Sequence, residues 1–295
     1  MAEADAGSTV PRRQLGRYLR ELRSEAGLTV RAAAKELERS EPTLWRIENG
    51  LTSVRSVEVG VMCRLYGANE QLTVALMALA KQTKAKGWWQ AYGDVLPEWF
   101  DLFVGLEAAA TAMDEYEHSI VPGLFQSEGY ARTTMAAFNP RWPADEIDRR
   151  VGLRRARQAI LTRMIDPPQL RVALREPVLV APVGGRTVMA DQLEHLATIS
   201  ELPNVSLRVV PVSVGYHPGI LTGSFTIMRF PPPPSGLHGE PPTIYKETYT
   251  GSLYLDKPAE IARFVTAFEA IWDAALGERP SRDLIARTAE DMRHG

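Results

Sequence analysis

The most constraining stretch of the sequence is residues 28–50, LTVRAAAKELERSEPTLWRIENG. Thr29 is a good helix N-cap, and the small alanines that follow it allow a second helix to cross closely. Ser40 begins another short helix with Pro42 in its first turn, where a missing N–H costs little. Gly50 is a natural end for that helix. The stretch therefore predicts a helix-turn-helix.

The second of these helices has one apolar edge and one polar edge. Leu44 and Ile47 are three residues apart, so we expect both to point inward. The opposite edge carries polar side chains together with Arg46. A short helix with an apolar inner edge and an arginine on its outer edge is typical of a recognition helix that enters the major groove of DNA.

The pattern S-x-x-T-L-x-R-I-E-N-G at residues 40–50 resembles the Cro/phage-repressor (XRE) type of helix-turn-helix. The resemblance implies binding to double-stranded DNA through the residues after the serine cap. The implied base-facing candidates are Glu41, Pro42, Thr43, Trp45 and Arg46, and the implied phosphate-facing candidates are Thr29, Ser40, Asn49 and the segment Leu51–Thr52. Arg55 is a further phosphate candidate, because it stands at the start of the next predicted helix. Arg55 fits a solvated surface charge equally well. Trp45 stands where a small or polar residue is usual, so base contact and packing both remain open for it.

Charge is distributed unevenly along the chain. The net charge is −2 over 295 residues, yet residues 11–66 carry 11 Lys and Arg against 7 Asp and Glu. A modestly basic end on an acidic body suits a module that faces phosphates. The single cysteine, Cys63, excludes an intrachain disulfide and fits a reducing compartment. No targeting segment and no membrane-spanning run is visible, so we expect a cytoplasmic protein without membrane contact.

The sequence predicts five segments. Residues 1–10 are expected to be a disordered tail, 11–81 a helix-turn-helix DNA-binding domain, 82–87 a linker, 88–277 a C-terminal regulatory or interaction domain, and 278–295 a polar tail, for which a short helix is the alternative. Within the first domain we expect further helices at 11–26, 54–66 and 69–81. Val57, Val61, Met62 and Leu65 are the inward residues predicted for the helix at 54–66.

A second resemblance covers most of the chain after residue 88. Its motifs are VPGLFQSEGYAR at 121–132, RRARQ at 154–158, VMADQLEHL at 188–196 and GYHPG at 215–219. They resemble the large, uncharacterised C-terminal domain attached to many actinobacterial XRE regulators of the WhiJ-type, antitoxin-like group. The resemblance implies a small partner protein, which the residues themselves do not indicate.

The expected fold is a mainly α N-terminal domain followed by a larger α+β domain with a small mixed sheet. Helices are predicted at 101–119 and 144–165, and the acidic residues Glu107, Asp114, Glu115 and Glu117 are read as a solvated face of the first. The arginines of the second fit salt bridges better than a second nucleic-acid surface. Strands at 170–174 and 205–210 around a helix at 189–200 predict a parallel crossover. Strands at 224–230 and 243–248 and a helix at 258–276 follow.

The sequence shows no catalytic constellation. No two histidines have metal-ligand spacing, and neither a G-x-S-x-G nor a phosphate-binding loop occurs, so we expect no enzyme, metal or cofactor. Trp88 and Trp89 fit a core wedge better than a stacking platform, and His217 fits a loop cap better than a functional base. A cleft lined by Trp88, Trp89, His217 and Tyr245 would favour a small-molecule effector.

These observations predict a transcription regulator whose third helix reads the major groove. One such module reads only a few base pairs, so we expect a homodimer on a two-fold-related site. The C-terminal domain would serve dimerisation and the binding of an effector or a partner protein. The alternatives are an antitoxin-like protein that mainly binds a small partner, which a wide exposed apolar patch would favour, and a DNA-tethered enzyme, which a metal-ready cluster would favour.

Overall fold

The computed structural model describes residues 10–83, 88–92, 94–96, 98–231, 239–249 and 251–294. These residues divide into two compact units. The first lies within Met1–Gly93, Pro97–Ala109 and Phe230–Glu240, and the second within Asp94–Leu96, Ala110–Arg229 and Pro241–Gly295. Residues 1–9 of the predicted tail and 84–87 of the predicted linker lie outside the described ranges.

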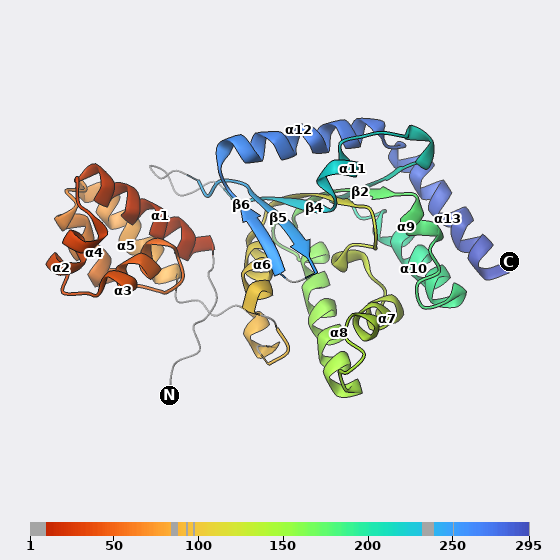
Figure 1. The fold of residues 1–295 in the computed structure, drawn as a ribbon, viewed down its shortest axis with the longest axis horizontal. Coiled ribbons are helices and arrows are strands. Elements are labelled where there is room, and N and C mark those ends of the chain that lie inside the picture. The colour runs from red at the N-terminus through yellow and green to blue at the C-terminus, as the bar shows by residue number, and fades with distance from the viewer. Residues whose placement is uncertain are drawn as a thin grey trace. The chain divides into compact units, whose positions relative to one another are not determined.

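The first unit is helical, as the sequence predicts (Figure 1). Its helices are α1 (Val10–Glu25), α2 (Val30–Glu36), α3 (Glu41–Glu48), α4 (Ser56–Leu65), α5 (Glu70–Gln82) and α6 (Glu98–Ala109), with a 3-10 turn, η1 (Trp88–Tyr92), between the last two. One apolar core joins the first five of them and includes Leu19, Ala33, Leu44, Val59 and Cys63. Ala33 and Ala34 of α2 lie in this core, and their small side chains allow α3 to cross α2 closely.

Side-chain caps fix the helix-turn-helix. The Thr29 hydroxyl accepts the Ala32 N–H at 3.1 Å at the start of α2, and the Ser40 hydroxyl accepts the Thr43 N–H at 3.3 Å at the start of α3. Gly50 follows α3 with a φ of +69°, a left-handed conformation that favours glycine. The predicted caps and helix end are confirmed.

The inward face predicted for α4 is correct at Met62 and Leu65 and wrong at Val57 and Val61. Val57 and Val61 are 72% and 42% exposed, whereas Val59, Met62 and Cys63 are buried. Positions 59, 62 and 63 follow the i, i+3, i+4 spacing of one helical face, and positions 57 and 61 lie on another. Apolar residues occur on every side of α4, so the sequence pattern alone does not distinguish the buried valine, Val59, from the exposed Val57 and Val61.

The second unit contains a mixed sheet, which confirms the predicted α+β class. In the described residues it consists of six strands in the order β3-β2-β1-β4-β5-β6. Their bounds are Ala112–Glu117, Gln169–Arg175, Val205–Val210, Phe225–Arg229, Thr243–Thr248 and Gly251–Leu255 for β1 to β6. The strands β1, β2 and β3 are parallel, and β4, β5 and β6 add antiparallel pairs beside β1. The predicted parallel crossover between β2 and β3 is confirmed.

Helices cover both faces of this sheet (Figure 1). The helix α12 (Pro258–Ala274) packs on one face through Phe268, Ile271 and Trp272. On the other side lie α7 (Glu128–Phe138), α8 (Ala144–Gln158) and α10 (Arg186–Ile199). Short segments complete the unit: η2 (Gly123–Phe125), η3 (Ala159–Thr162), α9 (Pro177–Val180), η4 (Val212–Val214) and α11 (Gly219–Thr222).

The helix predicted at 101–119 is wrong in its second half. The helix α6 ends at Ala109, and β1 begins at Ala112 in the middle of the sheet. Asp114 is buried rather than solvated, because Arg171 and Arg229 hold its carboxylate at 2.7 and 2.6 Å. Glu107 is buried as well.

The segment predicted as a polar tail or short helix at 278–295 is instead a long helix that packs into the second unit. Residues Glu278–His294 form a helix, α13, which packs against α10 and the edge strand β3. Ile285, Ala289 and Met292 are buried, and the Ser281 hydroxyl accepts the Val209 N–H at 2.9 Å. The buried face of α13 has only a few apolar residues, and the many charged residues between them make the sequence resemble a surface segment. The strand β6 was not expected either.

Candidate nucleic-acid interface

The helix α3 is attached to α1 by a paired charge. The Arg23 guanidinium donates to both carboxylate oxygens of Glu48 at 2.6 and 2.8 Å, and both side chains are largely buried. Its third nitrogen donates to the Leu28 carbonyl oxygen at 2.7 Å, at the entry to α2. One arginine therefore joins the last residue of α3 to the turn before α2, and a bidentate pair of this kind also fixes orientation.

A close approach of backbones sets the crossing of α1 and α3. A Cβ atom at Gly16 would lie 2.5 Å from the Ile47 carbonyl oxygen and 2.7 Å from that of Glu48. No side chain fits there, so the end of α3 rests directly on α1. Leu44 and Ile47, the predicted inner edge, are buried in the core of the unit.

The outer edge of α3 is open to solvent. Among the predicted base-facing residues, Glu41, Pro42, Trp45 and Arg46 are exposed and Thr43 is half-exposed. Positions 41 and 45, and 42 and 46, are each four apart, so they share one side of the helix. Trp45 is 53% exposed and lies outside the apolar core, which argues against a purely packing role.

The predicted phosphate-facing residues surround this edge. Thr29 and Ser40 are exposed and serve as N-caps, so their hydroxyls accept backbone N–H groups and can still donate to a phosphate. Asn49 is half-exposed and donates to the Trp45 carbonyl oxygen at 2.7 Å. Thr52 is half-exposed, and Arg55 is exposed at the N-cap of α4.

Sequence reasoning missed Arg31. This side chain is 87% exposed on α2 and lies 3.8 Å from the Glu41 carboxylate at the start of α3. An exposed arginine beside the first turn of a recognition helix is placed to reach a phosphate. Its position two residues after the Thr29 cap was the available signal, because that position lies on the first turn of α2.

The predicted ligand residues that belong to the second unit, His217 and Tyr245, do not share one cleft. Trp89 is buried in the first unit and donates its Nε1–H to Asp101 at 2.7 Å, which is a packing role. The side chain of Trp88 lies outside the described residues. His217 and Tyr245 belong to the second unit, where the sheet separates them.

Opposite faces of the sheet carry His217 and Tyr245. The buried ring of His217 meets the Tyr116 ring edge-on at 5.8 Å, and Tyr116 shares the α12 face with Ile244. Tyr245 follows Ile244 along β5 and so points to the other face, where its hydroxyl donates to Glu247 at 3.3 Å. Burial lowers the pKa of His217 and raises that of Tyr245.

The motif residues of the second unit form a buried hydrogen-bond network. The Gln192 amide donates to the Phe125 carbonyl oxygen at 2.8 Å and accepts the Ser127 N–H at 2.7 Å. Gln126 donates to the Val121 carbonyl oxygen at 2.7 Å. Gln158 on α8 donates to the Gln126 carbonyl oxygen at 2.7 Å. The glutamines of three separate motifs thus fix the turn at residues 121–127, which contacts both α8 and α10. Their role is structural.

The arginines of α8 form ion pairs. Arg149 lies 2.6 Å from Asp94, Arg150 lies 2.7 Å from Glu146, and Arg155 lies 3.4 Å from Glu128. These contacts agree with the expected salt bridges.

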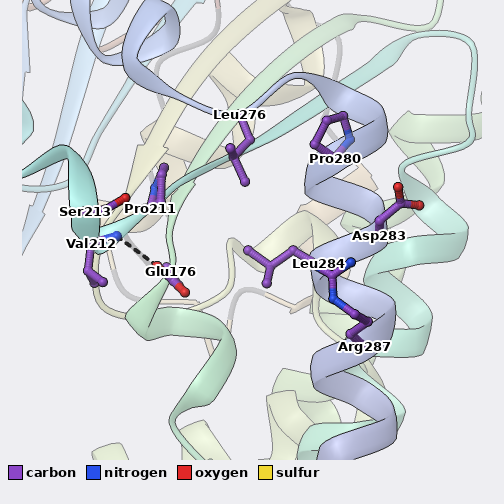
Figure 2. Close-up of a pocket in the computed structure, with 9 residues that line it drawn as sticks. All are labelled: Glu176, Pro211, Val212, Ser213, Leu276, Pro280, Asp283, Leu284 and Arg287. Atoms are coloured by element: carbon purple, nitrogen blue, oxygen red, sulfur yellow. Dashed lines mark hydrogen bonds between the residues drawn. The ribbon is translucent and has the colours of Figure 1, made fainter.

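A cavity of about 530 Å³ opens at the carboxyl ends of β2 and β3 (Figure 2). Figure 2 shows Leu284 and Arg287 of α13 on one side and Glu176 and Val212 on the other, with the Val212 N–H donating to Glu176 at 2.8 Å. The remaining lining residues are Pro211, Ser213, Leu276, Pro280 and Asp283. None of the four predicted ligand residues lines it.

Within the described ranges, no group of three His, Cys, Asp or Glu side chains is placed to hold a metal ion. In the same residues, no helix combines the length and apolar character needed to cross a membrane.

Comparison with known families gives two matches. A family model described as "Domain of unknown function (DUF5753)" matches residues 100–287, and one described as "Helix-turn-helix domain" matches residues 14–76. The second match contains α2 and α3, and it supports a DNA-binding regulator in general. No curated protein and no solved structure gives a significant match.

Proposed function

Because the chain belongs to the DUF5753 family and carries a helix-turn-helix domain ahead of that region, we propose that it is a sequence-specific transcription regulator of the XRE type. The outer edge of α3 carries this proposal. Its exposed side chains stand on a helix whose inner edge is buried and whose end is fixed by Glu48. A rigid helix with a solvent-exposed polar edge is what major-groove reading requires.

Two kinds of contact would divide the work of binding. Thr29, Ser40, Arg31 and Arg55 would contact phosphates and set register and affinity. Arg46 would read a base, since the arginine fork matches the two acceptors of guanine. Trp45 would add apolar contact, for which the methyl group of thymine is a suitable partner.

Dimerisation is part of the proposal. An eight-residue helix spans few base pairs, so two copies on related half-sites would supply the specificity of a regulator. The C-terminal domain would provide the dimer contact and bind an effector or partner. Sedimentation of the purified chain over a concentration series tests this, with a mass that stays monomeric as the contrary result.

A second candidate is an antitoxin-like protein of the WhiJ-type group that mainly binds a small partner protein. Exposed apolar side chains after β3 favour it. Tyr216 is 72% exposed, Ile220 49% and Leu221 77%, and all lie within seven residues of one another on and before α11. Clustered exposed apolar residues of this kind mark protein contacts.

Genome-wide mapping of bound DNA, paired with recovery of co-purifying proteins, tests both candidates. A shared motif under the bound regions, and binding of that duplex that weakens steeply between 50 and 200 mM salt, is the expected result for a regulator. A chain that binds no duplex at low salt but recovers a small protein stoichiometrically would favour the antitoxin-like role.

A further inference from the structure

We propose that the second unit binds a small anion, through a carboxylate or phosphate group, at the carboxyl ends of β1 and β2. The site consists of Arg175, Tyr116, His118 and His217, with Lys246 beside it. Binding itself does not depend on DNA, and the site relies on the proposed regulatory role only for its biological use. Ligands of open sheets commonly bind outside the carboxyl ends of parallel strands.

Strand register brings these residues together. The parallel pairing joins Tyr116 to Ala173 and Glu117 to Leu174, so the next residues along, His118 and Arg175, lie opposite each other. The Tyr116 ring stacks on His118 at 6.3 Å and meets His217 edge-on at 5.8 Å. Paired residues of two strands point to the same face, and Tyr116 and Ala173 both lie in the core beneath α12. His118 and Arg175 each follow two residues later along their strands and so point to that face as well.

Buried polar atoms in this group have no partner among the described residues. Tyr116 is fully buried and His217 is 4% exposed, yet the Tyr116 hydroxyl and His217 Nε2 make no hydrogen bond. Arg175 Nε is in the same condition, and Arg175 takes part in no ion pair with a described residue. An unsatisfied buried polar group costs free energy, so each of these atoms calls for a partner.

The available hydrogens are those that an anion accepts. The Gly219 N–H donates to His217 Nδ1 at 3.2 Å, which leaves Nε2 of a neutral ring as the protonated nitrogen. The Tyr116 hydroxyl and the Arg175 guanidinium are donors as well. Three buried donors of one region that have no acceptor among the described residues fit a carboxylate or phosphate oxygen and do not fit a cation.

Charge in this region favours the same ligand. Burial and the nearby Arg175 lower the pKa of both His118 and His217, and Lys246 lowers that of His118 further. The carboxylate of Glu117 is already bound by the Ser224 hydroxyl at 2.5 Å, and that of Glu176 accepts the Val212 N–H. The Lys246 ammonium donates to the Thr222 carbonyl oxygen, and no carboxylate of the described residues forms an ion pair with Arg175 or Lys246.

The surrounding segment limits the ligand's size and route. The segment 215–223 begins and ends with a glycine in the left-handed conformation, Gly215 with a φ of +69° and Gly223 with a φ of +62°. A Cβ at Gly219 would lie 2.5 Å from the Tyr116 hydroxyl oxygen, so this segment packs directly on the ring. Arg175 is half-buried and gives the solvent-facing side. The geometry suits one small anionic group that enters past Arg175.

Calorimetric titration of the full chain with inorganic phosphate, and separately with acetate, tests the site at an ionic strength held constant with chloride. We expect saturable binding of at least one probe. Arg175→Gln should weaken it at least tenfold, and Arg279→Gln, at an exposed position in the first turn of α13, should leave it unchanged. Saturation by phosphate alone or by acetate alone identifies the source of the group. No saturable binding, or equal binding by Arg175→Gln, would overturn the proposal.

A measurement on the unaltered chain covers the case in which Arg175→Gln does not fold. The histidine ring resonances of His118 and His217 should shift with the bound probe, while that of the distant His294 near the end of α13 should not. Absence of a shift at both site histidines would overturn the proposal equally. DNA binding assayed on the same preparation reports separately on the proposed regulator.

Discussion

Arg23 binds both carboxylate oxygens of Glu48, at 2.6 and 2.8 Å, across the contact between α1 and α3. The Glu48 side chain is 2% exposed, so this pair is removed from water at the point where the recognition helix ends. A buried bidentate pair is costly to break because the remaining charge stays unpaired. The orientation of α3 therefore depends on Arg23 and Glu48, two residues that are largely buried and lie away from its exposed edge.

Glu48→Ala should lower the free energy of unfolding of the first unit by about 3 kcal/mol, because it leaves the Arg23 charge buried and unpaired. Chemical denaturation followed by tryptophan fluorescence measures this loss. Glu41→Ala is the matched control: its partner Arg31 is exposed and 3.8 Å away, so its removal should cost less than about 1 kcal/mol. Equal losses for the two variants would show that the buried pair does not stabilise the unit.

Arg46→Ala should weaken binding to a specific site by roughly 1–3 kcal/mol if the guanidinium makes a bidentate base contact. Titration of labelled duplexes measures affinity for the mapped site and for random sequence. Arg64→Ala, at the far end of α4, serves as a charge-matched control and should reduce affinity little. A loss of the same size on random duplex would demote Arg46 to a phosphate contact.

Trp45→Ala should reduce DNA affinity while changing the free energy of unfolding by less than about 0.5 kcal/mol, because the side chain is 53% exposed. Leu44→Ala, one residue earlier on the buried edge, should instead destabilise the unit by roughly 2–5 kcal/mol. Thermal melts and duplex titrations of both variants separate the two effects. A Trp45 variant that melts like the Leu44 variant would assign Trp45 to packing.

Gln192→Ala should destabilise the second unit by about 2–4 kcal/mol, since it leaves the Phe125 carbonyl and the Ser127 N–H without their partner. Urea unfolding of the full chain, read from the transition of this unit, measures the change. Gln169→Ala, at an exposed position on β2, should have an effect of less than about 0.5 kcal/mol. Similar effects at both positions would show that the hydrogen bonds of Gln192 to Phe125 and Ser127 do not stabilise the unit.

The helix-turn-helix could be predicted from the sequence because the residues that fix it act locally. Thr29, Ser40 and Gly50 act within a few residues of themselves, through caps and a left-handed turn, so no distant contact was needed to place α2 and α3. The strands β2, β3, β4 and β5 were predicted for a similar reason, since their apolar runs are bounded by turn residues.

The central strand β1 was missed because its stability comes from far along the chain. Its sequence, AMDEYE, is acidic and follows an apolar helix, which favours a helical reading. Asp114 becomes tolerable in a strand only when Arg171 and Arg229 reach it from β2 and β4. The candidate ligand cleft failed for a related reason, because only the register of the sheet assigns His217 and Tyr245 to different faces.

Glu117 should make the second unit less stable as the pH rises. Burial, with a further contribution from Glu247, raises the pKa of Glu117 from 4.5 to about 7. The folded chain then binds more protons than the unfolded chain between those two values, so stability falls as the pH rises through that window. Glu117→Gln should flatten this part of the unfolding profile measured from pH 4.5 to 8.

The control for that experiment is Glu290→Gln, at an exposed position on α13, which should keep the slope of the unaltered chain. If the Glu117 variant retains the full slope, another group is responsible for the pH dependence. Well below pH 4.5, the Glu117→Gln variant and the unaltered chain should have similar free energies of unfolding, because Glu117 is then protonated in the folded and in the unfolded state.

The missing side chain at Gly16 has a consequence for the exposed edge of α3. Since the end of α3 lies against the backbone of α1 at that point, any side chain at residue 16 would push the end of α3 away from α1. The residues that would touch bases, at 41, 42, 45 and 46, stand on the exposed side and bear none of that contact. Under the proposed function, exchange of those four residues would change the preferred site and leave the contact between α1 and α3 intact.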